Sequence, residues 1–217
     1  MIDTFFSYFL VLFVVLDPVG VAAIFVGLSH SCPIALQRQM AIRGTLLASG
    51  ILVLFFLSGE WLLELLGIGV PAFRIAGGIL LFLLAIDMVF ARQSGLRSTT
   101  VKESNEAISK TDLSVFPLAF PLISGPGAMT TVLLVAPDAQ NLTLNIVFIT
   151  VLLSVLLIML LCLLHAPTIA RILGETGANV ISRLLGLILA SLAVQYIIDG
   201  LNAGLLLHII NQPPPTL

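Results

Sequence analysis

Two helix-breaking motifs interrupt long apolar stretches and carry residue types that could bind a small polar molecule. The first is Asp17-Pro18-Val19-Gly20, and the second is Ser124-Gly125-Pro126-Gly127-Ala128. Proline has no N–H and opens a helix, and glycine permits backbone conformations that other residues avoid. In apolar surroundings, the backbone groups released by a break must be satisfied by protein, water or a ligand. These motifs therefore indicate ligand binding rather than bond-breaking chemistry.

Asp17 is the acidic residue inside the first apolar stretch. Along a helix it lies about 18 Å from Phe5, close to the middle of a membrane. A carboxylate at that depth is costly and usually serves a function. Asp17 can also cap the half-helix that resumes at Pro18, and both roles are compatible because such an N-terminus also attracts anions. We expect Asp17, Pro18 and Gly20 to belong to a binding pathway.

The second break contains three prolines and two glycines within residues 117–128. We expect Ser124 to cap the resumed half-helix, whose first N–H groups carry partial positive charge and would suit a carboxylate. The structural alternative is a kink satisfied by neighbouring threonine hydroxyls. The binding interpretation assigns the substrate or ion site to Ser124, Gly125, Pro126, Gly127 and Ala128, with hydroxyls from Thr130 and Thr131.

Four further residues on the third and sixth spans have roles that support these breaks. Gly77, Gly78 and Gly186 are expected to allow close packing against the broken helices. Gln195 is among the deepest polar groups of the second half. It could line the substrate cavity or make a hydrogen bond between helices, and both interpretations remain open.

The elements that carry these residues are predicted to be membrane-spanning helices. The chain is 59% hydrophobic and only 9% charged, whereas a soluble domain carries about 25% charged residues. A spanning helix needs about 20 apolar residues. Unbroken apolar runs favour helices over barrel strands, which would alternate. The sequence predicts an all-α polytopic protein with six transmembrane helices, over residues 5–28, 42–66, 72–91, 114–136, 144–165 and 180–204.

Basic residues predict the orientation of these spans. Lys and Arg accumulate in cytoplasmic loops. With six spans, 8 of the 9 basic residues fall on one side, and only Arg74 falls on the other. Both termini are therefore expected outside. The segment 92–112 holds 7 of the 20 charged residues and is expected to be a cytoplasmic linker loop.

The two halves of the chain are related by an internal duplication. Pro18 and Pro126 are 108 residues apart, and the Arg-x-x-Gly motifs at Arg74 and Arg183 are 109 apart. Three spans per half is an odd number, so the halves must enter the membrane from opposite sides. We expect two inverted three-helix repeats, 1–91 and 113–217, with spans 1 and 4 broken. Many secondary transporters have this architecture.

Several classes of protein lack support in the sequence. No CxxC, HExxH or Cys/His cluster is present, and Cys32 and Cys162 lie in different halves. No paired Asp motif, GxSxG or Ser/His arrangement suggests an intramembrane hydrolase. The net charge of −2 gives no reason to expect nucleic-acid binding. We therefore expect no metal, no cofactor and no enzymatic activity.

Three stretches resemble signatures of the MarC family, which includes SnatA-type small neutral amino acid transporters. They are Arg74-Ile-Ala-Gly-Gly, residues 117–128 and Ile181-Ser-Arg-Leu-Leu-Gly186, and the Gly-Pro-Gly-Ala segment is the most specific. The resemblance covers residues 17–200 and implies residence in the bacterial inner membrane. Many members have Asn-Pro-x-Gly at the first break, where this chain has Asp17, and Pro where Ala23 stands.

The expected function is secondary transport of small neutral amino acids, such as glycine or alanine, by alternating access. The partners are then a small zwitterionic substrate, the lipid bilayer, and Na⁺ or H⁺ as a coupling ion. The substrate carboxylate would bind the amides after Pro126, and its ammonium would face Asp17 or freed carbonyls of span 1. The alternative is a non-transporting membrane scaffold or assembly factor that docks through residues 92–112.

Overall fold

The computed structural model of the chain describes residues 2–30, 32–90, 113–137 and 140–210, and the elements in these ranges are all helical. The expected linker 92–112 lies outside the described residues. The irregular helical segment η1 contains two residues with extended backbone, Phe116 and Phe120. The elements are α1 (Ile2–Leu16), α2 (Pro18–Ser29), α3 (Ile34–Leu65), α4 (Val70–Val89), η1 (Ser114–Ile123), α6 (Pro126–Val135), α7 (Leu142–Leu164) and α8 (Ala166–Ile210).

The described helices confirm a polytopic membrane protein with two broken spans. Five are long and apolar enough to cross a membrane, and the first of these, Ile2–Ser29, consists of α1 and α2. η1 and α6 together are also long and apolar enough, and they are bent by 49° at their junction, as in a broken span or a re-entrant loop, so the described helices give five or six candidate spans. Proline at the start of α2 and of α6 places both breaks where the sequence predicts them.

Two helices extend beyond the spans predicted for them. α3 begins at Ile34 rather than at residue 42, because Gln37 and Arg38 continue a helix readily outside the hydrocarbon. α8 begins at Ala166 but contains a left-handed residue, Gly174, with φ 63°. The spanning part of α8 is Thr176–Leu205.

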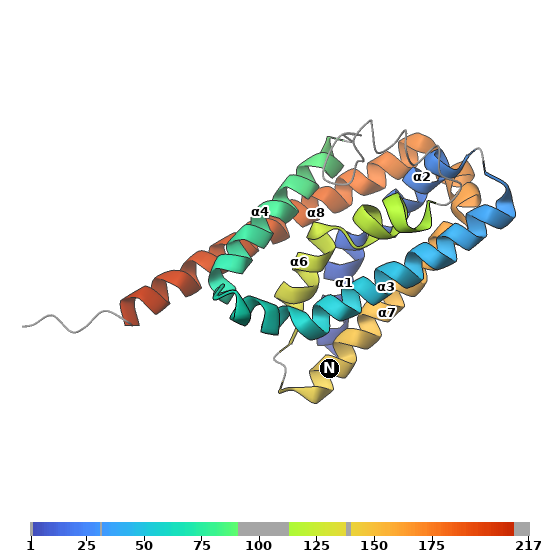
Figure 1. Cartoon of the computed structure of the whole chain (residues 1–217). Coiled ribbons are helices and arrows are strands. Elements are labelled where there is room, and N and C mark those ends of the chain that lie inside the picture. The colour runs from blue at the N-terminus through green and yellow to red at the C-terminus, as the bar shows by residue number, and fades with distance from the viewer. Residues whose placement is uncertain (1, 31, 91–112, 138–139, 211–217) are drawn as a thin grey trace, which may run out of the picture.

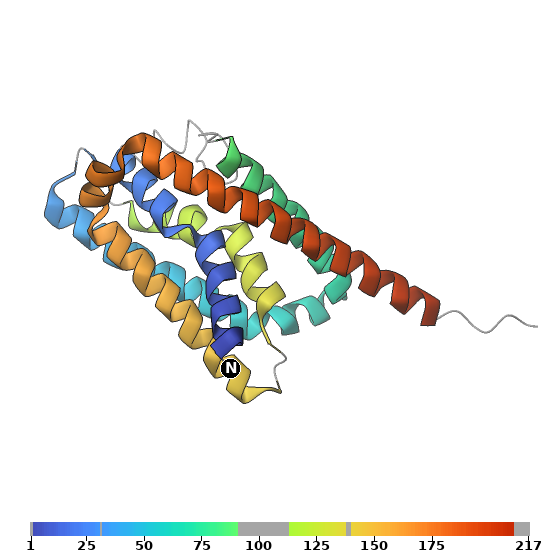
Figure 2. The same cartoon turned by 180° about the vertical axis from the view of Figure 1, so that it is seen from behind.

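Each broken span packs on the middle helix of the other half. α1 and α2 contact α7, whereas η1 and α6 contact α3. Figure 2 shows α1 and α2 lying between α7 and α8, and Figure 1 shows α6 between α3 and α4. The breaks are therefore enclosed by helices on several sides, and Asp17 is only 1% exposed.

The third helices of the two halves, α4 and α8, lie against each other in opposite directions (Figure 1). A side chain at Gly78 would meet Ala193 and Ile197, and one at Gly186 would meet Met88 and Val89. The higher-numbered part of one helix thus faces the lower-numbered part of the other. Close approach of this pair requires small residues at the contact.

The packing of the three predicted glycines is partly as expected. Gly77 does face a broken helix, since a side chain there would collide with Thr130 of α6. Gly78 and Gly186, in contrast, contact α8 and α4 and not the broken helices. The reason is geometric, because adjacent residues on a helix point about 100° apart and meet different neighbours.

Candidate functional site

The first break is a left-handed turn at Asp17 that is capped by its own side chain. The N–H of Asp17 still bonds to Phe13 at 3.0 Å, so α1 continues to this residue. Asp17 then takes φ 46° and ψ 65°, and its Oδ1 accepts the N–H of Gly20 at 3.1 Å. Because Pro18 has no N–H, the carbonyl of Val14 has no helical donor. The predicted capping role of Asp17 is thus present.

The second carboxylate oxygen of Asp17 faces α8. Oδ2 accepts a hydrogen bond from the hydroxyl of Ser182 at 3.3 Å. A side chain at Gly20 would collide with the Asp17 carboxylate and lie 2.8 Å from the Ser182 hydroxyl, so glycine makes room for this contact. Ser182 was not among the predicted site residues. The sequence feature that could have indicated Ser182 is its position immediately before Arg183, the first residue of the second Arg-x-x-Gly motif.

Ser124 does not cap the half-helix after the second break, contrary to expectation. Its N–H and its hydroxyl both donate to the carbonyl of Ala119, at 2.9 and 2.7 Å. The side chain is therefore turned back toward η1, and Gly125 is the residue that precedes α6. A side chain at Gly125 would collide with the carbonyl of Pro121, so only glycine fits this position without a backbone shift.

The first turn of α6 presents backbone amides without helical acceptors. The first helical bond of α6 joins the N–H of Met129 to the carbonyl of Gly125 at 3.0 Å. The N–H groups of Gly127 and Ala128 precede that bond, and Pro126 has none. Helix geometry gives these amides a partial positive charge at the break. A carboxylate is the chemical group that they would bind best.

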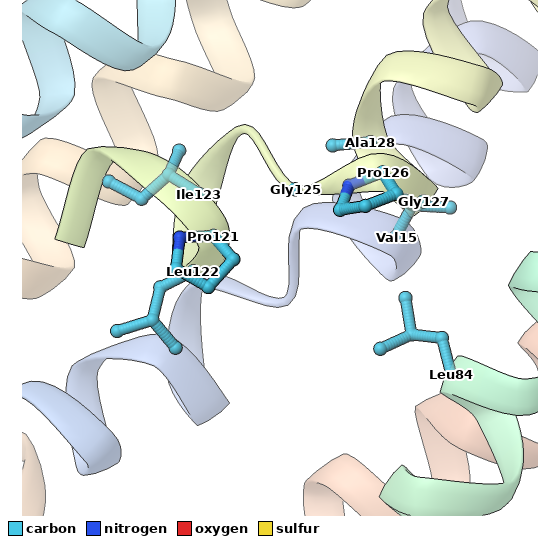
Figure 3. A pocket seen from close by; sticks show the side chains of 9 residues that line it. All are labelled: Val15, Leu84, Pro121, Leu122, Ile123, Gly125, Pro126, Gly127 and Ala128. Carbon is cyan, nitrogen blue, oxygen red and sulfur yellow. The ribbon is translucent and has the colours of Figure 1, made fainter. Parts of the chain in front are cut away.

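A pocket lies where the two breaks meet. The space free of atoms is about 330 Å³ with its open mouth included, but the part that can hold the centre of a water molecule is only about 20 Å³, which is room for about one water. Figure 3 shows the unwound part of the first span passing next to Gly125 and Pro126, with Leu84 facing them across the space. Among the residues that the structure describes, no charged side chain lines the pocket. The lining residues are Val15, Leu84, Pro121, Leu122, Ile123, Gly125, Pro126, Gly127 and Ala128.

The predicted residues divide into those that line the pocket, those that form the adjacent first break, and those that serve the helices themselves. Gly125, Pro126, Gly127 and Ala128 line the pocket. The lining also includes residues that were not predicted, namely Val15, Leu84, Pro121, Leu122 and Ile123. Asp17, Pro18 and Gly20 form the adjacent break, but the carboxylate of Asp17 is turned toward α8 and is not part of the lining.

The remaining predicted side chains serve the helices themselves. The Thr131 hydroxyl donates to the carbonyl of Gly127 at 2.8 Å, and Thr130 packs against Gly77. Gln195 is exposed on α8, where its Nε2 donates to Asp199 Oδ1 at 2.8 Å. Gln195 is therefore not at the pocket, because it lies on the outer face of α8, and its bond is within one helix rather than between helices.

These features define a multi-pass helical membrane protein with a small pocket between two discontinuous spans. Comparison with known proteins gives the same class, because residues 2–205 match the family described as MarC family integral membrane protein. The chain belongs to the MarC family.

Relatives with similar sequences occur in archaea and bacteria. A UPF0056 membrane protein of Methanocaldococcus jannaschii is 35% identical over 195 residues, which are 90% of this chain and 94% of that protein. The UPF0056 membrane protein YhcE of Escherichia coli is 30% identical over 201 residues, or 91% and 92% of the two chains. A relative from Pyrococcus abyssi is 36% identical over 94% of this chain and 96% of its own length. No solved structure matches significantly.

Proposed function

We propose that this protein is a secondary transporter of small neutral amino acids, with glycine and alanine as its substrates. The observation that carries the proposal is the pocket between the two breaks, where the N-terminal amides of α6 at Gly127 and Ala128 adjoin an apolar lining. The substrate carboxylate binds these amides in the same way that anions bind at helix N-termini. Leu84 and Val15 line the pocket, and in a substrate-bound state they would restrict the substrate side chain to a hydrogen or a methyl group.

The substrate ammonium is assigned to the carbonyls released at the first break. Val14 lacks a helical donor because Pro18 has no N–H, and Val15 of the same turn lines the pocket. Of the two ammonium partners considered from the sequence, the carbonyls fit this conformation better, because Asp17 faces Ser182. We assign Asp17 to coupling, as the group that binds H⁺ or Na⁺ during transport.

The arrangement of the helices supports transport by alternating access. Each broken span packs on the middle helix of the other half, and α4 and α8 run in opposite directions, as two inverted repeats require. In transporters of this kind the substrate site lies at the interface of the repeats. We place the protein in the cytoplasmic membrane with both termini outside, as the distribution of Lys and Arg indicates.

Uptake of labelled glycine and alanine into proteoliposomes tests this function. The wild-type protein is expected to give saturable flux. Gly127→Ala should reduce alanine uptake more than glycine uptake, because the added methyl group lies 2.9 Å from Leu84 at the pocket. The matched control is Gly50→Ala, which has nothing within 4 Å and should retain both fluxes. Absence of saturable flux with folded wild-type protein would contradict the proposal.

A further inference from the structure

Each half-helix after a break packs on the third helix of the other half, but the two contacts lie at different heights. Gly20 of α2 meets Ser182 of α8. Thr130 of α6 meets Gly77 of α4. Both pairs run in opposite directions, as Figure 2 shows for α2 and α8. In the α4–α6 pair, Gly127 lies near Leu81 and Leu84 while Thr130 lies near Gly77, which establishes the direction.

The repeat offsets allow the positions of the two contacts along their helices to be compared. Offsets of 108 and 109 make Gly20 equivalent to Ala128 and Ser182 equivalent to Phe73. In an antiparallel pair in which Thr130 meets Gly77, Ala128 lies beside residue 79 rather than Phe73. The α2–α8 contact and the α4–α6 contact therefore differ in position along the helices by about six residues, or roughly 9 Å at 1.5 Å per residue. If the halves were in the same state, the two contacts would coincide.

We infer that Ser182 is a positioning residue that holds Asp17 in one state of the transport cycle, and that its hydrogen bond opens when the two halves exchange registers. In the exchanged state, α8 shifts along α2 and α2 turns about its own axis, because Ala22 points about 200° away from Gly20, until Gly186 meets Ala22 as Gly77 now meets Thr130. Both Gly186 and Ala22 are small enough for that close contact. This inference rests on the proposed function only in treating the two registers as the two states of alternating access.

The hydrogen bond stabilises one state and not the other, so removing it shifts the population between them. A hydrogen bond to a charged group contributes enough to change such a ratio by about tenfold. The control residue is Ser191, whose hydroxyl bonds to the carbonyl of Leu187 on its own helix at 3.2 Å.

Distances between pairs of spin labels report the register of α8 along α2 in nanodiscs, without any substrate. Spin labels are placed at Ile24→Cys on α2 and Leu201→Cys on α8, which are 41% and 49% exposed, in a background with Cys32→Ser and Cys162→Ser. The exchanged register brings these labels closer by roughly 9 Å. We expect Ser182→Ala to raise the ratio of the shorter to the longer distance about tenfold, whereas Ser182→Thr and Ser191→Ala leave that ratio unchanged.

Asp17→Asn weakens the same bond from its other end and should shift the ratio in the same direction, which keeps the test decisive if Ser182→Ala fails to fold. If both variants give the distances of Ser191→Ala, the inference is wrong. If glycine and alanine are transported but the distances between the labels do not change in either variant, this inference is wrong and the proposed function stands. A distance shift without flux of either amino acid would instead support the two registers and overturn the proposed function.

Discussion

Asp17 combines a backbone requirement with a side-chain role. Its φ of 46° lies in the left-handed region, which Asp and Asn tolerate better than other non-glycine residues because their short polar side chains bond locally. The same side chain caps α2 through Gly20 and reaches Ser182. An Asn at this position could adopt the same local structure, whereas only Asp offers a carboxylate.

Substitutions at Asp17 should separate these two roles. Asp17→Ala removes the cap and is expected to lower the free energy of unfolding by about 1–2 kcal/mol, with a matching fall in the thermal midpoint in detergent. Asp17→Asn keeps a capping oxygen and should retain most of that stability. In proteoliposomes, however, Asp17→Asn should lose the dependence of alanine uptake on the coupling ion. Unchanged ion dependence in this variant would remove Asp17 from the coupling role.

At the scale of elements, the two breaks show what local chemistry predicts and what it misses. The proline positions correctly predict where α2 and α6 begin, because the missing N–H acts wherever the chain lies. The cap of α6 was predicted wrongly. Ser124 has an ordinary capping side chain, but the turn before it brings the carbonyl of Ala119 within reach, and the hydroxyl bonds there instead.

The second break should be intolerant of any side chain at Gly125. Gly125→Ala forces the new methyl group onto the Pro121 carbonyl, and overpacking of this kind costs about 1–3 kcal/mol. Gly69→Ala is a close control, because Gly69 also precedes a helix with similar backbone angles and has only an ordinary contact at 3.6 Å. Thermal unfolding should show a larger loss for Gly125→Ala, and equal losses would contradict the steric argument.

At the scale of the whole molecule, the helices enclose the breaks while leaving apolar outer faces. Exposed leucines and isoleucines on α3, α7 and α8 are what a lipid-facing surface requires. The N-terminus and the α3–α4 turn lie at one end of the molecule in Figure 1, and the α2–α3 and α7–α8 connections lie at the other. Arg38 and Arg171 follow those two connections, so the positive charge gathers at one end.

This charge distribution predicts which end faces the cell interior. In a background with Cys32→Ser and Cys162→Ser, Ile68→Cys in the α3–α4 turn should react with an impermeant maleimide in intact cells. Ile34→Cys, at the start of α3 and 75% exposed, should react only after lysis. The reverse pattern would show that both termini face the cytoplasm, against the positive-inside rule.

The sequence by itself determined the class of protein, the positions of the breaks and the presence of small residues on the third and sixth spans. These properties follow from composition, proline and glycine, which act through local chemistry. Only the tertiary structure decided that Asp17 meets Ser182, 165 residues away, that Gln195 faces outward, and that Gly78 and Gly186 join α4 to α8. Such contacts depend on the rotation and register of packed helices, and the apolar faces of a membrane helix leave both largely unspecified.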